Sequence, residues 1–141
     1  MIVREASPTE LTVCLEIRKE VFIDEQHVPR SEEIDGLDWQ CAHFLAFRGE
    51  TAIGTARLRP LADGDMKVER VAVRKASRGT GAGRALMEAI ETEAYRRGAV
   101  NMHLSAQMGA LKFYESLGWA AEGPVFDDAG IPHRKMHKRI G

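Results

Sequence analysis

Cysteine and long hydrophobic runs are both scarce in this 141-residue sequence. Only Cys14 and Cys41 are present, without CxxC spacing, so we expect two free buried thiols in a reducing compartment; a disulfide between them is the less favoured alternative. No apolar run approaches the length of a membrane span, and the first ten residues, MIVREASPTE, lack the hydrophobic region of a signal peptide. We therefore expect a cytoplasmic protein that does not bind membranes.

An excess of charge of either sign is also missing. The 20 Lys and Arg residues nearly balance the 21 Asp and Glu residues, giving a formal net charge of −1. A broad nucleic-acid-binding surface is therefore not expected. The hydrophobic share of 44% and the charged share of 29% are ordinary for a globular chain. The length allows one sizeable core, and we expect residues 1–141 to form a single domain.

The most informative segment runs from Arg70 to Gly83, with the sequence RVAVRKASRGTGAG. An alternating apolar strand pattern leads into a basic turn, three glycines at alternate positions follow, and a helical pattern begins at Ala82. The free N–H groups and the dipole of a helix N-terminus favour an anion, and glycines let it approach closely. Neither the P-loop nor the dinucleotide pattern fits. The segment predicts an anion site, with a glycine-rich loop that binds nothing as the alternative.

A long acidic segment, DEQHVPRSEEIDGLD, spans residues 24–38. It contains six carboxylates and a single arginine, Arg30. Such charged loops are usually just solvated, which is the ordinary interpretation for most of these side chains. Long loops in compact domains are nevertheless often binding loops, and an acidic one would suit a cationic amine.

The remaining patterns indicate a mixed α+β fold. A helix is expected to start after Ser7 and to continue for about four turns to Phe22, with Arg18 as the one polar residue on its apolar face. A strand after a helix pairs most easily in parallel with the preceding strand, which makes segment 100–106 the parallel partner of 66–73. The other expected elements are strands 2–4, 41–47, 51–59, 119–126 and 131–138 and helices 85–97 and 108–117.

Two motifs resemble those of a known family. Arg78-x-x-Gly81-x-Gly83, after a V-A-V strand, resembles the acetyl-coenzyme A signature of the GNAT N-acetyltransferases. The segment QMGALKFYESLGW, from Gln107 to Trp119, resembles the family's N-x-x-A-x-x-F-Y-x-x-x-G-F segment, with Gln and Trp replacing Asn and Phe. The segments VFIDEQHVP, EEIDGLD and GIPHRKM resemble the ElaA- and YjcF-like branch. The resemblance implies the GNAT fold, a mixed, mostly antiparallel sheet flanked by helices with one parallel strand pair.

The same resemblance implies acetyl-coenzyme A as the acyl donor. The pantetheine arm would lie along the strand that ends at Val73, and the amides of the glycine turn would hold the pyrophosphate. Strands four and five would separate after Val71 to admit the thioester. Arg74 and Lys75 either contact the nucleotide phosphates or are simply solvated. The implied cofactor-binding residues are Val71, Ala72, Val73, Arg78, Gly79, Thr80, Gly81, Ala82, Gly83, Arg84 and Gln107.

The implied reaction is direct attack of a neutral amine on the thioester in a ternary complex. Tyr114 matches the family's tyrosine and would protonate the departing thiolate, while the backbone N–H of Val71 would polarise the carbonyl. Glu69 is the candidate base, with Glu25 as runner-up and His43 attractive because of the ordinary histidine pKa. The expected acceptor-binding residues are Glu25, Glu33, Asp35 and His43.

The partner predicted by these patterns is a small-molecule amine rather than a protein, and a homodimer is left open. The histidines His133 and His137 lie on one side of the last strand, where a packed, hydrogen-bonded histidine is the ordinary interpretation. Because no third ligand accompanies them, we predict no metal. The alternative function is a non-catalytic acyl-coenzyme A-binding sensor or interaction module.

Overall fold

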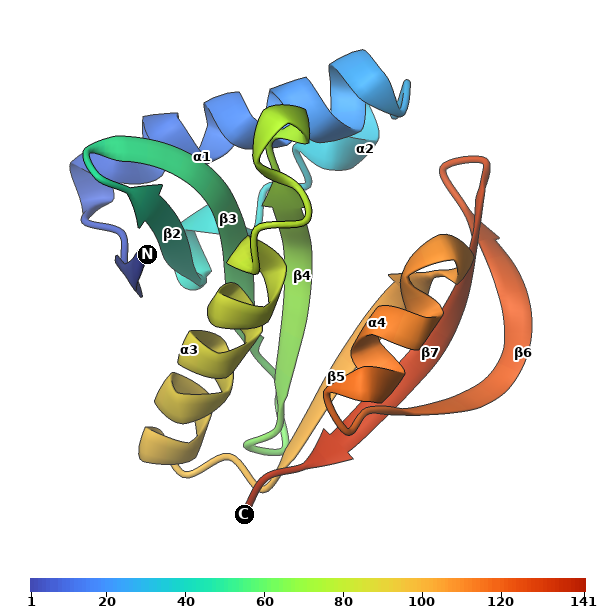
Figure 1. Ribbon diagram of the computed structural model, residues 1–141. Helices are drawn as coiled ribbons and strands as arrows, with labels where there is room; N and C mark the ends of the chain where they lie inside the picture. Colours follow the sequence, from blue (N-terminus) through green and yellow to red (C-terminus); the bar gives the residue numbers. More distant parts are fainter.

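One seven-stranded sheet organises the computed structural model, which describes all 141 residues (Figure 1). The strand order is β1-β2-β3-β4-β5-β7-β6, and only the β4–β5 pair is parallel. The mixed, mostly antiparallel sheet predicted from the sequence is therefore confirmed. The strands are β1 (Ile2–Glu5), β2 (Ala42–Arg48), β3 (Thr51–Pro60), β4 (Met66–Val73), β5 (Asn101–Gln107), β6 (Ala120–Asp128) and β7 (Ile131–Arg139).

Helices cover both faces of this sheet. The helix α3 (Ala82–Arg96) and the short α4 (Leu111–Ser116) pack on one face, where Leu86 and Tyr114 join the main hydrophobic core. The opposite face of β2–β4 is covered by α1 (Leu11–Arg18), whose Ile17 packs in a second, smaller core with Ala72 of β4. Figure 1 shows α1 and the one-turn α2 (Arg30–Glu33) lying across one end of the sheet.

The first helical region differs from its expected form. A single helix through Phe22 was expected, but a 3-10 turn (Pro8–Glu10) precedes α1, and a π-helical segment, η2 (Lys19–Glu25), follows it. The predicted start is confirmed, because Glu10 Oε1 accepts a hydrogen bond from the Ser7 amide at 2.9 Å. Wider π-helical turns often occur at functional sites, and this one delivers the chain to the cavity described below.

Strands β4 and β5 separate after a short paired stretch. Only Met66 with Met102 and Lys67 with His103 are in register, and beyond them the strands diverge (Figure 1). The expected separation after Val71 is therefore wrong by four residues. Within the diverging part, β4 carries a register shift against β3, and Arg70 there has a φ of +56°. The edge of β4 that faces β5 is unpaired from Val68 onward.

Both cysteine side chains are free thiols, as expected. Cys14 lies on the buried face of α1, and Cys41 is half-buried with its Sγ 3.2 Å from the Leu37 carbonyl oxygen. None of the helices combines the length and the apolar character needed to cross a membrane.

Candidate active site

A cavity of about 240 Å³ occupies the gap where β4 and β5 separate. Its walls come from the middle of β4, from β5 and α4, and from the turn between β6 and β7, while residues of η2 and α2 cover it. Five residues predicted to form the site line this cavity together: Glu33, Glu69, Val71, Gln107 and Tyr114. Segments far apart in the sequence therefore converge where the sheet is open.

Tyr114, on α4, brings its phenol side chain to this cavity. The side chain is only 8% exposed and packs edge-to-face against Phe113 and Trp119, with ring centroids 5.0 and 6.5 Å away. Burial raises the pKa of Tyr114 to about 12. The phenol therefore stays protonated throughout the physiological range and can act as a hydrogen-bond donor.

Glu69 is surrounded by cations on β3 and β4. Its Oε1 accepts hydrogen bonds from Arg57 at 2.9 Å and from Arg59 at 2.8 Å, and Lys67 lies 3.7 Å from Oε2. Burial alone would raise the pKa of Glu69, but the Arg59 hydrogen bond and the nearby positive charges outweigh it and lower the pKa. Glu69 is therefore held as a carboxylate.

Two acidic residues predicted to bind the acceptor are engaged inside the protein. Glu33 is 2% exposed and accepts a hydrogen bond at its Oε2 from Arg18 Nη2 at 2.9 Å. Asp35 makes a two-point pair with Arg57, and Arg18 and Arg57 both also contact Asp38, at 2.7 and 2.9 Å. Three of the six carboxylates of segment 24–38, those of Glu33, Asp35 and Asp38, thus balance buried arginines.

The other two acceptor candidates, Glu25 and His43, do not line the cavity. Glu25 Oε1 accepts a hydrogen bond from Arg78 Nη2 at 2.9 Å, which places it beside the glycine turn. His43 is buried on β2, where its Nε2 lies 2.8 Å from the Asp38 carbonyl oxygen and must donate to it. Burial lowers the pKa of His43, so the ring is held neutral at physiological pH.

The glycine turn has the geometry expected of an anion site. Gly79 and Gly81 adopt φ values of +78° and +89°, and the space that a Cβ atom would occupy at each is open. Gly81 is the N-cap of the fifteen-residue helix α3 and has no side chain to accept its first N–H groups. Gly83 differs, because a Cβ atom there would lie 3.2 Å from Phe113 Cζ of α4. Its small size serves helix packing.

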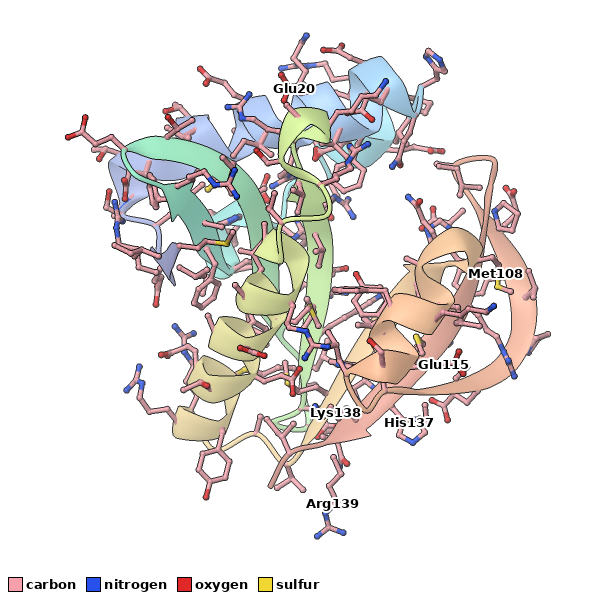
Figure 2. The ribbon with its side chains drawn as sticks, viewed as in Figure 1. Glu20, Met108, Glu115, His137, Lys138 and Arg139 are labelled. Carbon is pink, nitrogen blue, oxygen red and sulfur yellow. The ribbon has the colours of Figure 1, made fainter.

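The basic residues around this turn are only partly available. Arg74 donates to Glu20, labelled in Figure 2, at 3.0 Å and to the Ala52 carbonyl oxygen at 3.0 Å. Arg78 is held by Glu25 and by the Val73 carbonyl oxygen. Lys75 is exposed and has no ion pair, so it is the basic side chain of the turn that is free to meet a phosphate.

Three functional features escaped the sequence analysis. Arg57 is completely buried and joins three carboxylates, although its strand reads as an ordinary alternating one. Arg70 reaches the carbonyl oxygens of Glu32 and Glu33 because the bulge redirects it. His133, considered above only as a possible metal ligand, lines the cavity from β7, a placement that no local pattern could indicate.

Comparisons with known proteins agree with this geometry. The family model described as "Acetyltransferase (GNAT) domain" matches residues 3–140. YjcF of Bacillus subtilis, named an uncharacterized N-acetyltransferase, is 42% identical over 123 residues, which cover 86% of this chain and 87% of YjcF. ElaA of Escherichia coli is 31% identical over 142 residues, covering 96% of this chain and 92% of ElaA.

Solved structures give the same result. The crystal structure of ElaA superposes with a TM-score of 0.85 at 26% identity and covers 98% of this chain and 99% of its own. An acyl-CoA N-acyltransferase from Pseudomonas aeruginosa superposes with a TM-score of 0.84 at 32% identity, covering 97% of each chain.

Proposed function

The chain belongs to the GNAT acetyltransferase family, in its ElaA- and YjcF-like branch, and from this premise we propose that it moves an acetyl group from acetyl-coenzyme A to a primary amine. The observation that carries the proposal is the cavity at the opening of the sheet, where Tyr114 and the unpaired edge of β4 meet. An extended thioester arm that pairs with this edge would bring its carbonyl to the cavity.

The chain's own residues support each part of donor binding. The amides of Gly79, Gly81 and the first turn of α3 would hold the pyrophosphate, and the exposed Lys75 would meet a nucleotide phosphate. The backbone of Val71 to Val73 would pair with the pantetheine arm. The backbone N–H of Val71, whose residue lines the cavity, would polarise the carbonyl.

The chemistry proposed here is direct attack in a ternary complex. Burial raises the pKa of Cys14 and of Cys41, and neither side chain lines the cavity, so neither is suited to carry the acetyl group. Tyr114 would donate a hydrogen bond to the sulfur as negative charge develops on it. The acceptor is proposed to be a small amine, because the cavity is small and partly covered by η2 and α2.

Initial-rate kinetics with acetyl-coenzyme A and a panel of n-butylamine, spermidine, glucosamine and an aminoglycoside test the proposal. Intersecting double-reciprocal lines, with no acetylated cysteine in the mass spectrum of the protein, are expected of a ternary complex. Parallel lines with an acetyl-enzyme would contradict direct attack. Tight binding of acetyl-coenzyme A without N-acetylated product from any amine would favour the sensor or interaction module.

A further inference from the structure

His133 reaches the cavity from a strand that lies beside β5. Residues His133 of β7 and Gln107 of β5 are directly paired, so their side chains project from the same face of the sheet. The Gln107 amide donates to Gln26 Oε1 at 2.8 Å, at the end of η2. His133 therefore lies on the face of the sheet that η2 covers.

Tyr114 approaches the cavity from the opposite face. It packs in the main core with Leu104 of β5 and Met136 of β7, which are paired with each other and whose side chains alternate with those of Gln107 and His133. The cavity thus passes through the sheet where β4 and β5 separate, with the imidazole on one side and the phenol on the other. A group that attacks from the η2 side would meet the imidazole of His133. A group that leaves toward the α4 side would meet the phenol of Tyr114.

The protonation of the His133 ring follows from its contact with the backbone. Its Nδ1 lies 2.7 Å from the Ile131 carbonyl oxygen. Because a carbonyl oxygen only accepts, Nδ1 carries the hydrogen, and Nε2 of the neutral ring holds a free lone pair. The ring is half-buried and stacks on Phe126, with centroids 5.9 Å apart and planes inclined by 26°. The contact and the stacking fix the ring orientation.

No other group in the cavity is equally suited to accept a proton. Glu69 is held by Arg57 and Arg59, and Glu33 by Arg18. Lys67 and Arg70 are cations, and Ser105 and Gln107 of β5 are neutral. The carboxylates of Glu32 at the cavity roof and Asp128 at the β6–β7 turn are exposed. The remaining charged neighbours of His133 on β6 and β7 are Asp127, Arg134 and Lys135.

We propose that His133 is the catalytic base that takes the proton of the acceptor amine, an inference that rests on the acetyl transfer proposed above. As the amine nitrogen forms its bond to the carbonyl carbon, its proton passes to Nε2 of His133. The C–S bond then breaks, and its electron pair stays on the sulfur, which Tyr114 stabilises by a hydrogen bond. His133 releases its proton to solvent and the thiolate takes one from solvent, so that amine and acetyl-coenzyme A become amide and coenzyme A. Glu69, whose carboxylate is held by Arg57 and Arg59, takes no proton in this scheme.

The test compares His133→Asn with His137→Asn. His137 lies on the same face of β7 but outside the cavity, near the other end of the strand, where Figure 2 labels it. With n-butylamine as probe, deprotonation of the amine gives log kcat/KM a slope of about one against pH, and an enzyme base adds a second unit at low pH, where the base is itself protonated. His133→Asn should lose that second unit and about 10²-fold or more in rate. His137→Asn should keep both the second unit of slope and the wild-type rate.

A second readout needs no turnover. The ligand is a bisubstrate in which the coenzyme A sulfur carries a CH2–C(O)–NH-butyl group, whose amide N–H stands where the amine attacks. His133→Asn should weaken this ligand about tenfold and leave coenzyme A binding unchanged, because one hydrogen bond is lost. If the wild type bound both ligands and the His133→Asn and His137→Asn variants bound the bisubstrate equally well, the role of His133 would be overturned. Failure of the wild type to bind either ligand would instead overturn the acetyl transfer on which the inference rests.

Discussion

Arg57 of β3 and Asp35, in the segment after α2, form a two-point ion pair. The Nη1–Oδ1 and Nη2–Oδ2 distances are 2.9 and 2.8 Å. The same guanidinium, completely buried, also contacts Asp38 Oδ1 and Glu69 Oε1 at 2.9 Å each. One side chain therefore connects the acidic segment to the β4 wall of the cavity, and this connection fixes where that segment lies.

Replacing Arg57 by methionine should destabilise the fold strongly. Removing the cation leaves Asp35, Asp38 and Glu69 facing one another without it, and breaking a buried ion pair from one side costs about 3–5 kcal/mol. Urea unfolding of Arg57→Met measures the loss. Arg4→Gln, which removes the exposed partner of Glu10, is the matched control and should change stability little. Equal stability of the two variants would contradict a structural role for Arg57.

Stability should also depend on pH through this network. The Arg57 hydrogen bond holds the pKa of Asp35 well below its usual range, and Arg18 and Arg57 lower that of Asp38 despite its burial. Because these folded-state values lie below the ordinary Asp value of ~3.9, their contribution is complete above about pH 5 and is lost as the pH falls through and below that value. Urea unfolding at a series of pH values should show this fall, and Asp35→Asn should flatten it. If Asp35→Asn left the dependence of stability on pH unchanged, the Asp35–Arg57 pair would contribute nothing to stability.

Substitution of the two glutamates of α2 should have different effects, because Glu33 is buried and Glu32 is exposed. Glu33→Gln should lower the melting temperature, since its buried carboxylate balances Arg18. Glu32 has no ion pair and lines the cavity, so Glu32→Gln should preserve the fold and raise the KM of a cationic amine such as spermidine more than that of acetyl-coenzyme A. If the KM of spermidine and that of acetyl-coenzyme A rose equally, the attraction of the acceptor by this carboxylate would be refuted.

Coenzyme A should stabilise the protein thermally, and Gly81→Glu should abolish that shift. A carboxylate at this N-cap would repel the phosphates and fill their space. Since Gly81 has a φ of +89°, any side chain there adds backbone strain, and Gly81→Asn, an uncharged residue that tolerates this conformation, is the control. Thermal shifts with coenzyme A should survive at least partly in the Asn variant. A full shift in the Glu variant would place the phosphates elsewhere.

Tyr114→Phe should fold, bind acetyl-coenzyme A nearly as well as the wild type, and lose about 10²-fold in kcat. The pKa of about 12 makes complete proton transfer to a thiolate, whose acid has an ordinary value near 8.5, unfavourable by about 5 kcal/mol. Hydrogen bonding to the developing charge is therefore the expected contribution. Pre-steady-state kinetics, which isolate the chemical step, give the comparison. A wild-type chemical rate in Tyr114→Phe would make Tyr114 a packing residue.

The local part of this account could be predicted from the sequence. The strand, glycine turn and helix from Arg70 to Gly83 are contiguous, and their periodicities and φ requirements act over a few residues. The same holds for the Ser7–Glu10 start of the first helical region. The pairs β2–β3, β3–β4, β4–β5 and β6–β7 could also be predicted, because successive elements usually lie side by side.

The non-local part could not be predicted. Whether Glu33 is solvated or buried depends on Arg18, fifteen residues away, and whether Asp35 is free depends on Arg57, twenty-two residues away. His133 enters the cavity only because β7 inserts between β5 and β6 in the sheet. The early end of the β4–β5 pairing and the register shift of β4 against β3 likewise have no signal in the residues from Met66 to Val73.

The most direct test of the central claim is a mass-spectrometric search for N-acetylated product when the wild-type protein is incubated with acetyl-coenzyme A and the amine panel. We expect at least one primary amine to be acetylated with stoichiometric release of coenzyme A, and Tyr114→Phe to slow this release. Saturable acetyl-coenzyme A binding with no acetylated amine and no coenzyme A release would contradict it.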